Sequence, residues 1–149
     1  MRHPGHESFL LVRSGGLRCA LPTAAVRQVA QMPALHPVPG SKTHLLGLAQ
    51  ISGEPLAILD LFVLLAGGPA GPPPRSAVVL GQGEDGRRSV LGLAVDEIEA
   101  VTAISEVTEV EEAGGLVVGR AKFEGEWVQV LDPSVLFSED WDLPDEEHV

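Results

Sequence analysis

Apolar residues along this chain come in short runs, and glycine, proline or polar residues separate one run from the next. The stretch "SFLLVRSGGLRCALP" holds two such runs around Ser14, Gly15 and Gly16, a pattern that predicts a β-hairpin. Two further runs, "SAVVLG" and "RRSVLGLAVDEI", flank the glycine-rich "GQGEDG". Many short strands joined by frequent turns predict an all-β barrel or sandwich with at most short helices.

One segment occurs twice. The stretch "AQISGEPLAILDLFVLL", Ala49 to Leu65, aligns without a gap with "AKFEGEWVQVLDPSVLF", Ala121 to Phe137, which lies 72 residues further on. Each copy predicts a strand, a turn containing glycine, a return strand and a short helix whose first amides are capped by Asp60 or Asp132. A single duplication of this kind predicts two small barrels related by a pseudo-two-fold axis.

Outside these copies the pattern is less decisive. "TAAVRQVAQM" is compatible with a short helix that Thr23 caps, while its "VRQVA" part also fits a strand. Pro33, Pro37 and Pro39 then interrupt regular structure, and "GGPAGPPPR" reads as a linker. The last residues, 138–149, form an acidic tail that we expect to be disordered apart from a docking role for Trp141.

Composition excludes several classes of function. The chain has 149 residues, with 10 basic and 21 acidic side chains and a formal net charge of -11. This balance opposes binding to nucleic acids and to anionic lipid surfaces, because both need a basic face. The single Cys19 excludes an intramolecular disulfide, and we find no signal core and no run of about 18 apolar residues. We therefore expect a cytoplasmic protein without direct membrane insertion.

No grouping of residues predicts catalysis, a cofactor or a metal. "GQGEDG" matches the glycine spacing of a nucleotide site, but the residues after it predict a strand rather than the helix that such a site needs. Cys19 sits in an apolar run, and the carboxylates of Asp96, Glu97 and Glu99 fit a solvated strand edge better than an acid–base pair. The histidines show no zinc-like spacing outside the N-terminal stretch, and they are His3, His6, His36, His44 and His148.

The segments "RCALPTAAVRQVAQM", "PVPGSKTHLLGLAQISGEPLAILDLFVLL", "VLGLAVDEIEAV" and "VVGRAKFEGEWVQVLDPSVLF" together resemble the CheW-like domain of bacterial chemosensory systems. The resemblance runs from about Phe9 to Phe137 and is most specific in "LGLAQISGEPLAILDL". It implies two SH3-like, five-stranded β-barrels around a shared apolar core. It places one CheW-like domain at 8–137, with the first subdomain at about 14–74 and the second formed by 8–13 plus 75–137.

The resemblance also implies a function and partners. Proteins of this family are non-enzymatic adaptors that join the signalling tip of methyl-accepting chemoreceptors to the regulatory domain of the histidine kinase CheA, in membrane-associated arrays. Receptor contacts lie in the groove region between the barrels, and the partner-binding residues carried over are Val26, Gln28, Gly47, Gln50, Ser52 and Gly53. We expect these residues to lie at or near one exposed patch of the first barrel, with Gly47 allowing the backbone of a partner to approach closely.

One position departs from the family. Ser52 stands where an arginine is usual, so the turn Gln50–Gly53 lacks a charged fork for carboxylate or carbonyl groups. The change fits a specialised paralogue that keeps one partner, a receptor or another regulator, and has lost affinity for the kinase. A small-molecule or peptide-binding β-barrel domain remains the alternative from another class.

Overall fold

The computed structural model describes residues 7–40, 44–67, 73–82, 89–110 and 115–138. In chain order the elements are β1 (Ser8–Ser14), β2 (Leu17–Pro22), the 3₁₀ turn η2 (Thr23–Ala25), β3 (Val26–Gln31), β4 (Leu45–Ile51), β5 (Glu54–Asp60), α1 (Leu61–Ala66), β6 (Ser76–Gln82), β7 (Ser89–Val95), β8 (Glu97–Ala103), β9 (Thr108–Glu109), β10 (Val117–Phe123), β11 (Glu126–Leu131) and the 3₁₀ helix η3 (Pro133–Ser138).

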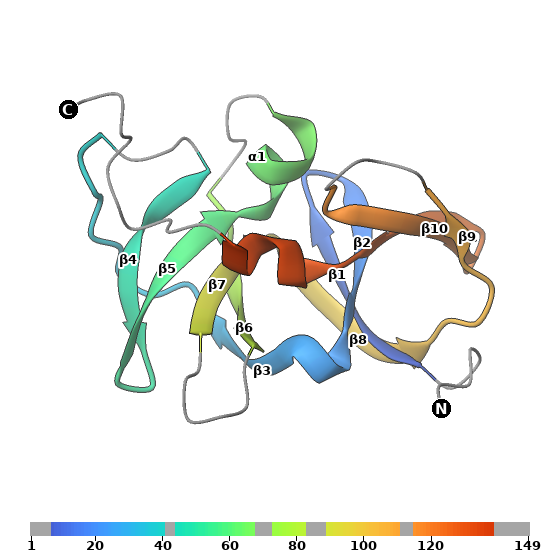
Figure 1. The fold of residues 1–149 in the computed structure, drawn as a ribbon, viewed down its shortest axis with the longest axis horizontal. Helices are drawn as coiled ribbons and strands as arrows, with labels where there is room; N and C mark the ends of the chain where they lie inside the picture. The colour runs from blue at the N-terminus through green and yellow to red at the C-terminus, as the bar shows by residue number, and fades with distance from the viewer. Residues whose placement is uncertain (1–6, 41–43, 68–72, 83–88, 111–114, 139–149) are drawn as a thin grey trace.

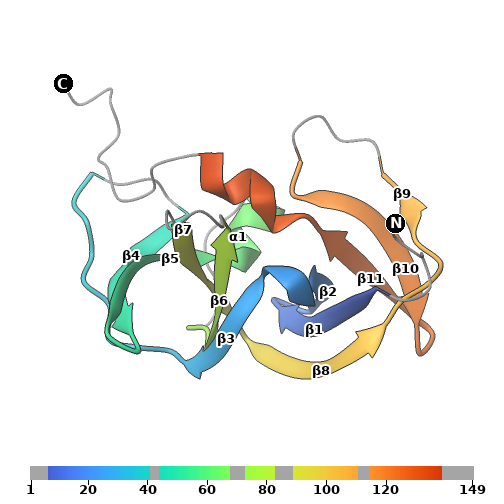
Figure 2. The ribbon, with the colours of Figure 1, turned by 60° about the horizontal axis from the view of Figure 1, so that its bottom comes forward.

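The strands form two antiparallel-rich sheets that lie side by side (Figures 1 and 2). The five-stranded sheet, called here the first barrel, has the order β3-β6-β7-β5-β4. The six-stranded sheet, called the second barrel, has the order β8-β1-β2-β11-β10-β9, in which β9 is only two residues long. The predicted all-β fold of two small barrels with short helices is confirmed.

The two halves of the chain exchange hairpins. The β1–β2 hairpin belongs to the second barrel, where β2 pairs in parallel with β11 through Gln129↔Cys19 and Val130↔Ala20. The β6–β7 hairpin belongs to the first barrel, where β7 pairs in parallel with β5. The sheets therefore divide the chain differently from the boundaries expected from sequence, which placed β2 in the first subdomain and β6 and β7 in the second. Apolar patterning gives no information on which distant strand each hairpin pairs with, and so it left this exchange undetermined.

The sequence repeat is also a structural repeat. In the first copy, Ser52 and Gly53 have φ of 52° and 80°, and in the second copy Glu124 and Gly125 have φ of 55° and 79°. Two successive residues with positive φ make the tight turn that suits the twist of a hairpin. The strand register also shifts at matched places, between Leu45 and Gly47 in one copy and between Val117 and Gly119 in the other. Both copies thus use the same turn and the same bulge.

Both predicted aspartate caps are present. The Oδ1 atom of Asp60 accepts from the amides of Phe62 (2.9 Å) and Val63 (3.3 Å) at the start of α1. In the second copy, Oδ1 of Asp132 accepts from the amide of Ser134 at 3.1 Å, and Pro133 occupies the first position of η3. Proline costs little there because its missing N–H would have no partner inside the helix.

The ambiguous segment after β2 is mostly strand. Thr23 begins η2 but caps nothing, because its hydroxyl donates to the Ser8 carbonyl oxygen at 3.2 Å. "VRQVA" falls within β3, which pairs antiparallel with β6. Pairing with a distant strand thus decides against the helical alternative that local propensity had allowed.

The barrels share an apolar core. Pairs of leucines that lie 72 positions apart in the chain both contribute to it: Leu59 and Leu131 are 0% and 1% exposed, and Leu21 and Leu93 are fully buried. Each barrel also has a smaller core of its own, around Ile58 in the first and Val130 in the second. Neither half could bury this shared face alone, which is a physical reason for the duplicated chain to act as one unit. Within the described residues, no helix has the length and apolar character needed to cross a membrane.

Candidate partner-binding surfaces

The predicted patch is partly assembled at the tip of the β4–β5 hairpin. The side-chain Nε2 of Gln28, on β3, donates to the Ser52 hydroxyl oxygen at 3.2 Å, and the same hydroxyl lies 3.3 Å from Gln28 Oε1. Gln50, Ser52 and Gly53 are exposed, and a side chain added at Gly53 would meet nothing within 4 Å. The structure therefore brings these four polar or small residues to one exposed end of the first barrel.

The other two predicted residues are not exposed. Val26 is half-buried and packs against the shared core. Gly47 is buried with φ of 155°, and a Cβ built on it would lie 2.9 Å from the His36 carbonyl oxygen. The backbone that approaches Gly47 is thus that of His36 in the same chain, held by a two-way bridge to Leu48. Our expectation that Gly47 lies in the exposed patch is corrected by this packing.

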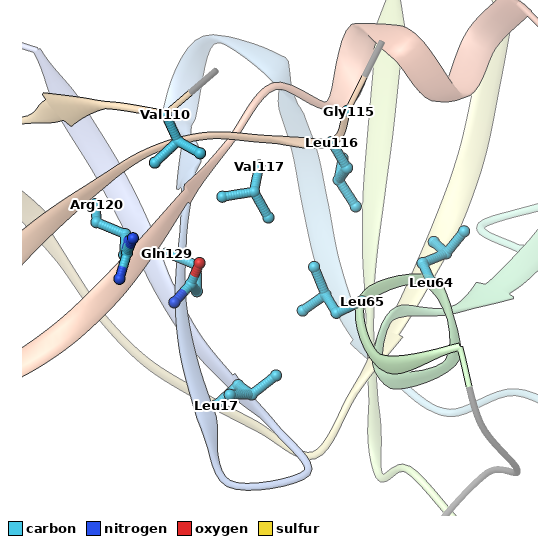
Figure 3. A pocket seen from close by; sticks show the side chains of 9 residues that line it. All are labelled: Leu17, Leu64, Leu65, Val110, Gly115, Leu116, Val117, Arg120 and Gln129. Atoms are coloured by element: carbon cyan, nitrogen blue, oxygen red, sulfur yellow. The ribbon is translucent and has the colours of Figure 1, made fainter. Parts of the chain in front are cut away.

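The structure also has a groove between the barrels, and the sequence did not predict which residues line it. It has a volume of about 490 Å³ and lies between α1 of one half and β2, β10 and β11 of the second barrel (Figure 3). Its apolar wall combines Leu64 and Leu65 from α1 with Leu17, Leu116 and Val117. These residues come from three distant segments, so no local pattern could have revealed that they share a surface. We call it the inter-barrel groove.

One end of the inter-barrel groove is polar. Arg120 on β10 and Gln129 on β11 are directly opposed across the strand pair and line the groove together (Figure 3). Arg120 is exposed and forms no ion pair with any residue in the described part of the chain. The groove thus offers an apolar wall beside an arginine that has no ion pair among the described residues, an arrangement that fits an amphipathic helix carrying a carboxylate.

A network of five charged side chains joins β1, β2, β8 and the β10–β11 hairpin of the second barrel. Arg13 donates to Glu99 at 2.7 Å and grips Glu126 with both terminal nitrogens at 2.8 and 3.0 Å. Arg18, which is 9% exposed, donates to Glu99 at 2.8 Å and to Glu124 at 3.1 Å. Glu99 does lie on an edge strand, β8, but its side chain is paired and only 17% exposed, so our interpretation of it as solvated is corrected.

The network shifts the acidities of its members. Partial burial acts to raise the pKa of Glu99, but hydrogen bonds from Arg18 and Arg13 outweigh it and leave the pKa below its usual value. The hydrogen bonds from Arg13 lower the pKa of Glu126. These carboxylates thus stay ionised and hydrogen-bonded, and they act as structural partners of the two arginines.

The described residues offer little for catalysis or metal binding. Cys19 is fully buried, and burial raises its pKa to about 12, which keeps the thiol protonated and unreactive. No group of three or more potential metal-ligating side chains is found within the described ranges. Residues 83–86 of "GQGEDG" lie outside those ranges, but the element that follows is the strand β7, as expected, and not a helix.

Comparison with known proteins gives consistent results. A family model described as the CheW-like domain matches residues 8–141. A "Probable chemotaxis protein CheW" of Rhizobium etli is 26% identical over 102 residues, covering 68% of this chain and 64% of the relative. This chain therefore aligns with slightly less than two thirds of that relative's length. The crystal structure of the scaffolding protein TtCheW from Thermoanaerobacter tengcongensis gives a TM-score of 0.67 at 17% identity, covering 85% of this chain and 88% of that chain. This likeness establishes the fold.

Proposed function

The chain belongs to the CheW-like domain family, whose model spans residues 8–141, and we propose that it joins a chemoreceptor signalling tip to the regulatory domain of a CheA-type histidine kinase. Scaffolding in chemotaxis is the role of this family, and its members are non-catalytic. The observation that carries the proposal is the family match over nearly the whole described chain, together with the two-barrel fold.

The inter-barrel groove supports the receptor half of this proposal. A receptor signalling tip is a helical hairpin, and the apolar wall of Leu64, Leu65 and Leu116 can receive the apolar face of such a helix. Arg120 at the polar end can then pair with a carboxylate on the same helix.

The experiment is a titration of the full chain with a receptor signalling hairpin and, separately, with a kinase regulatory domain. Arg120→Glu reverses the one charge among the described residues that line the groove, and it is expected to weaken receptor binding about tenfold. Arg75→Glu makes the same charge change at an exposed position of the first barrel that lines no part of the groove, and it serves as the matched control. Equal losses for both variants would point to general charge attraction and would remove the groove from the proposal.

A second candidate is a paralogue that keeps one of the two partners. The specific observation is the neutral contact between Gln28 and Ser52 at a turn where the family usually carries arginine. In this case one of the two titrations shows a heat of binding and the other shows none. Binding of neither partner by the folded chain would refute both candidates.

A further inference from the structure

The second barrel has an open, largely apolar pocket. It has a volume of about 640 Å³, and Val107 and Val118 line it above the buried side chain of Val130. Val107 and Val118 are 37% and 38% exposed. We call it the second-barrel pocket. It lies on the other barrel from the Gln28–Ser52 contact.

The internal repeat supplies a comparison for this exposure. The residues 72 positions earlier in the chain are Leu35 for Val107 and Leu46 for Val118. Both leucines are partly buried and pack against the core of the first barrel. The matched positions thus carry larger, partly buried side chains in the first barrel and smaller, exposed side chains in the second. Exposed aliphatic side chains of this kind, clustered over a hollow, are typical of a docking site.

The rim of the second-barrel pocket is acidic. Its described lining includes Glu7, Glu109 and Asp132, and no lysine or arginine is among those described residues. The position that matches Glu109 in the first barrel is Pro37, so this carboxylate is particular to the second barrel. An apolar floor within a carboxylate rim favours an occupant that carries a positive charge next to an apolar side chain. A second copy of this chain, with a net charge of -11, is a poor occupant.

The adjoining strand favours an extended occupant. Glu109 lies on β9, which ends the six-stranded sheet and pairs only with β10 among the described strands. The outer backbone groups of such an edge strand can accept hydrogen bonds from, or donate them to, an added segment.

We propose that the second-barrel pocket docks a short, extended segment of a partner protein in which lysine or arginine adjoins an aliphatic or aromatic residue. The apolar side chain fills the space between Val107 and Val118, and the cation pairs with Glu109 and Asp132. The second-barrel pocket shares Val110 with the inter-barrel groove, but its other lining residues are different. The proposal does not rest on the function proposed above, because its test needs neither a receptor nor a kinase.

The test starts from random heptapeptides displayed on phage and selected on the immobilised full chain at low ionic strength. The selected sequences are expected to share a lysine or arginine next to leucine, isoleucine, valine or phenylalanine. A synthetic peptide of the shared sequence is then titrated calorimetrically into wild-type protein and into variants. Selection of no common sequence, or of one without a basic residue, overturns the proposal.

Two matched pairs of variants locate the binding. Glu109→Lys should weaken the peptide about tenfold or more, while Glu97→Lys, an equal charge change at an exposed residue of β8 outside the pocket, should change its affinity less than about twofold. Val118→Ser should also weaken binding, while Val101→Ser, at a 61% exposed position of β8, should not. Thermal unfolding of each variant checks that it is folded. Retained affinity in Glu109→Lys, or an equal loss in Glu97→Lys, refutes the assignment.

Discussion

Gly47 offers a sharp test of the fold, because two separate effects oppose any side chain there. Its φ of 155° lies in a region where side-chain-bearing residues are strained by about 1–3 kcal/mol. A Cβ would also press on the His36 carbonyl oxygen at 2.9 Å. Moving His36 would disturb its two hydrogen bonds to Leu48, of 2.8 and 2.9 Å, each worth about 0.5–1.5 kcal/mol. Gly47→Ala should therefore reduce the free energy of unfolding by about 4 kcal/mol, near the middle of the summed range.

Gly53→Ala is the matched control for this substitution. Gly53 also has a positive φ, of 80°, but no atom lies within 4 Å of its Cβ position. Only the conformational cost of a left-handed residue remains, about 1–2 kcal/mol. Urea unfolding followed by circular dichroism should thus show a loss about 2 kcal/mol larger for Gly47→Ala than for Gly53→Ala. Equal losses would show that the contact with His36 yields freely, and they would refute the steric part of the reasoning.

Gly119→Ala separates the two effects further. Gly119 is the repeat partner of Gly47, and a Cβ there would lie 2.5 Å from Val107 Cγ1 and 3.0 Å from the Thr108 carbonyl oxygen. Its φ is not in the positive range, so only the close contact acts, and the Val107 side chain can rotate away. The expected loss is smaller than that of Gly47→Ala in the same urea series. A larger loss would mean that the close approach outweighs backbone strain at this bulge.

Three further predictions follow from the core, the turn and the charged network. Leu59→Ala and Leu131→Ala should each cost about 2–5 kcal/mol in urea unfolding, and losses below about 1 kcal/mol at both would contradict the shared core. Ser52→Arg should raise affinity for a receptor tip or kinase regulatory domain roughly ten- to hundredfold, as a charged hydrogen bond of about 1.5–3 kcal/mol allows, and unchanged calorimetric titrations with both partners would leave Ser52 a plain turn residue. The pKa of Glu99 is lowered in the folded state, so its contribution is present above about pH 4.5 and is lost as the pH falls below that value. Wild type should therefore lose more stability than Glu99→Gln between pH 7 and pH 3, and parallel pH profiles would contradict the pairing of Glu99 with Arg18.

The repeat explains why much of the local structure could be predicted. Glycine within a polar turn, aspartate before a short apolar segment and proline at a helix start each act through the backbone within a few residues. The turns at Gly53 and Gly125 and the caps at Asp60 and Asp132 therefore follow from local sequence alone.

Features that depend on distant pairing could not be predicted in this way. The exchange of hairpins rests on parallel pairing of β2 with β11 and of β7 with β5, and either strand would have satisfied its apolar pattern in the other sheet. Glu99 looks like any exposed carboxylate until Arg13 and Arg18 are brought against it from the N-terminal hairpin. Glycine at position 47 does allow another backbone to approach closely, as predicted, but that backbone is His36 of the same chain.

The two copies keep the same backbone devices but differ in the side chains that they expose. Ser52 at the first turn makes a neutral contact with Gln28, while Glu124 at the matched turn pairs with Arg18. A charged side chain is thus accommodated at a φ of 55°, which indicates that Ser52→Arg can fold with the same turn. The shared turns and caps therefore give the two barrels the same backbone structure. The side chains that differ at matched exposed positions are where each barrel can recognise a different partner. On this reasoning the neutral end of the first barrel and the acidic pocket of the second are separate surfaces, and a substitution in one should leave binding at the other unchanged.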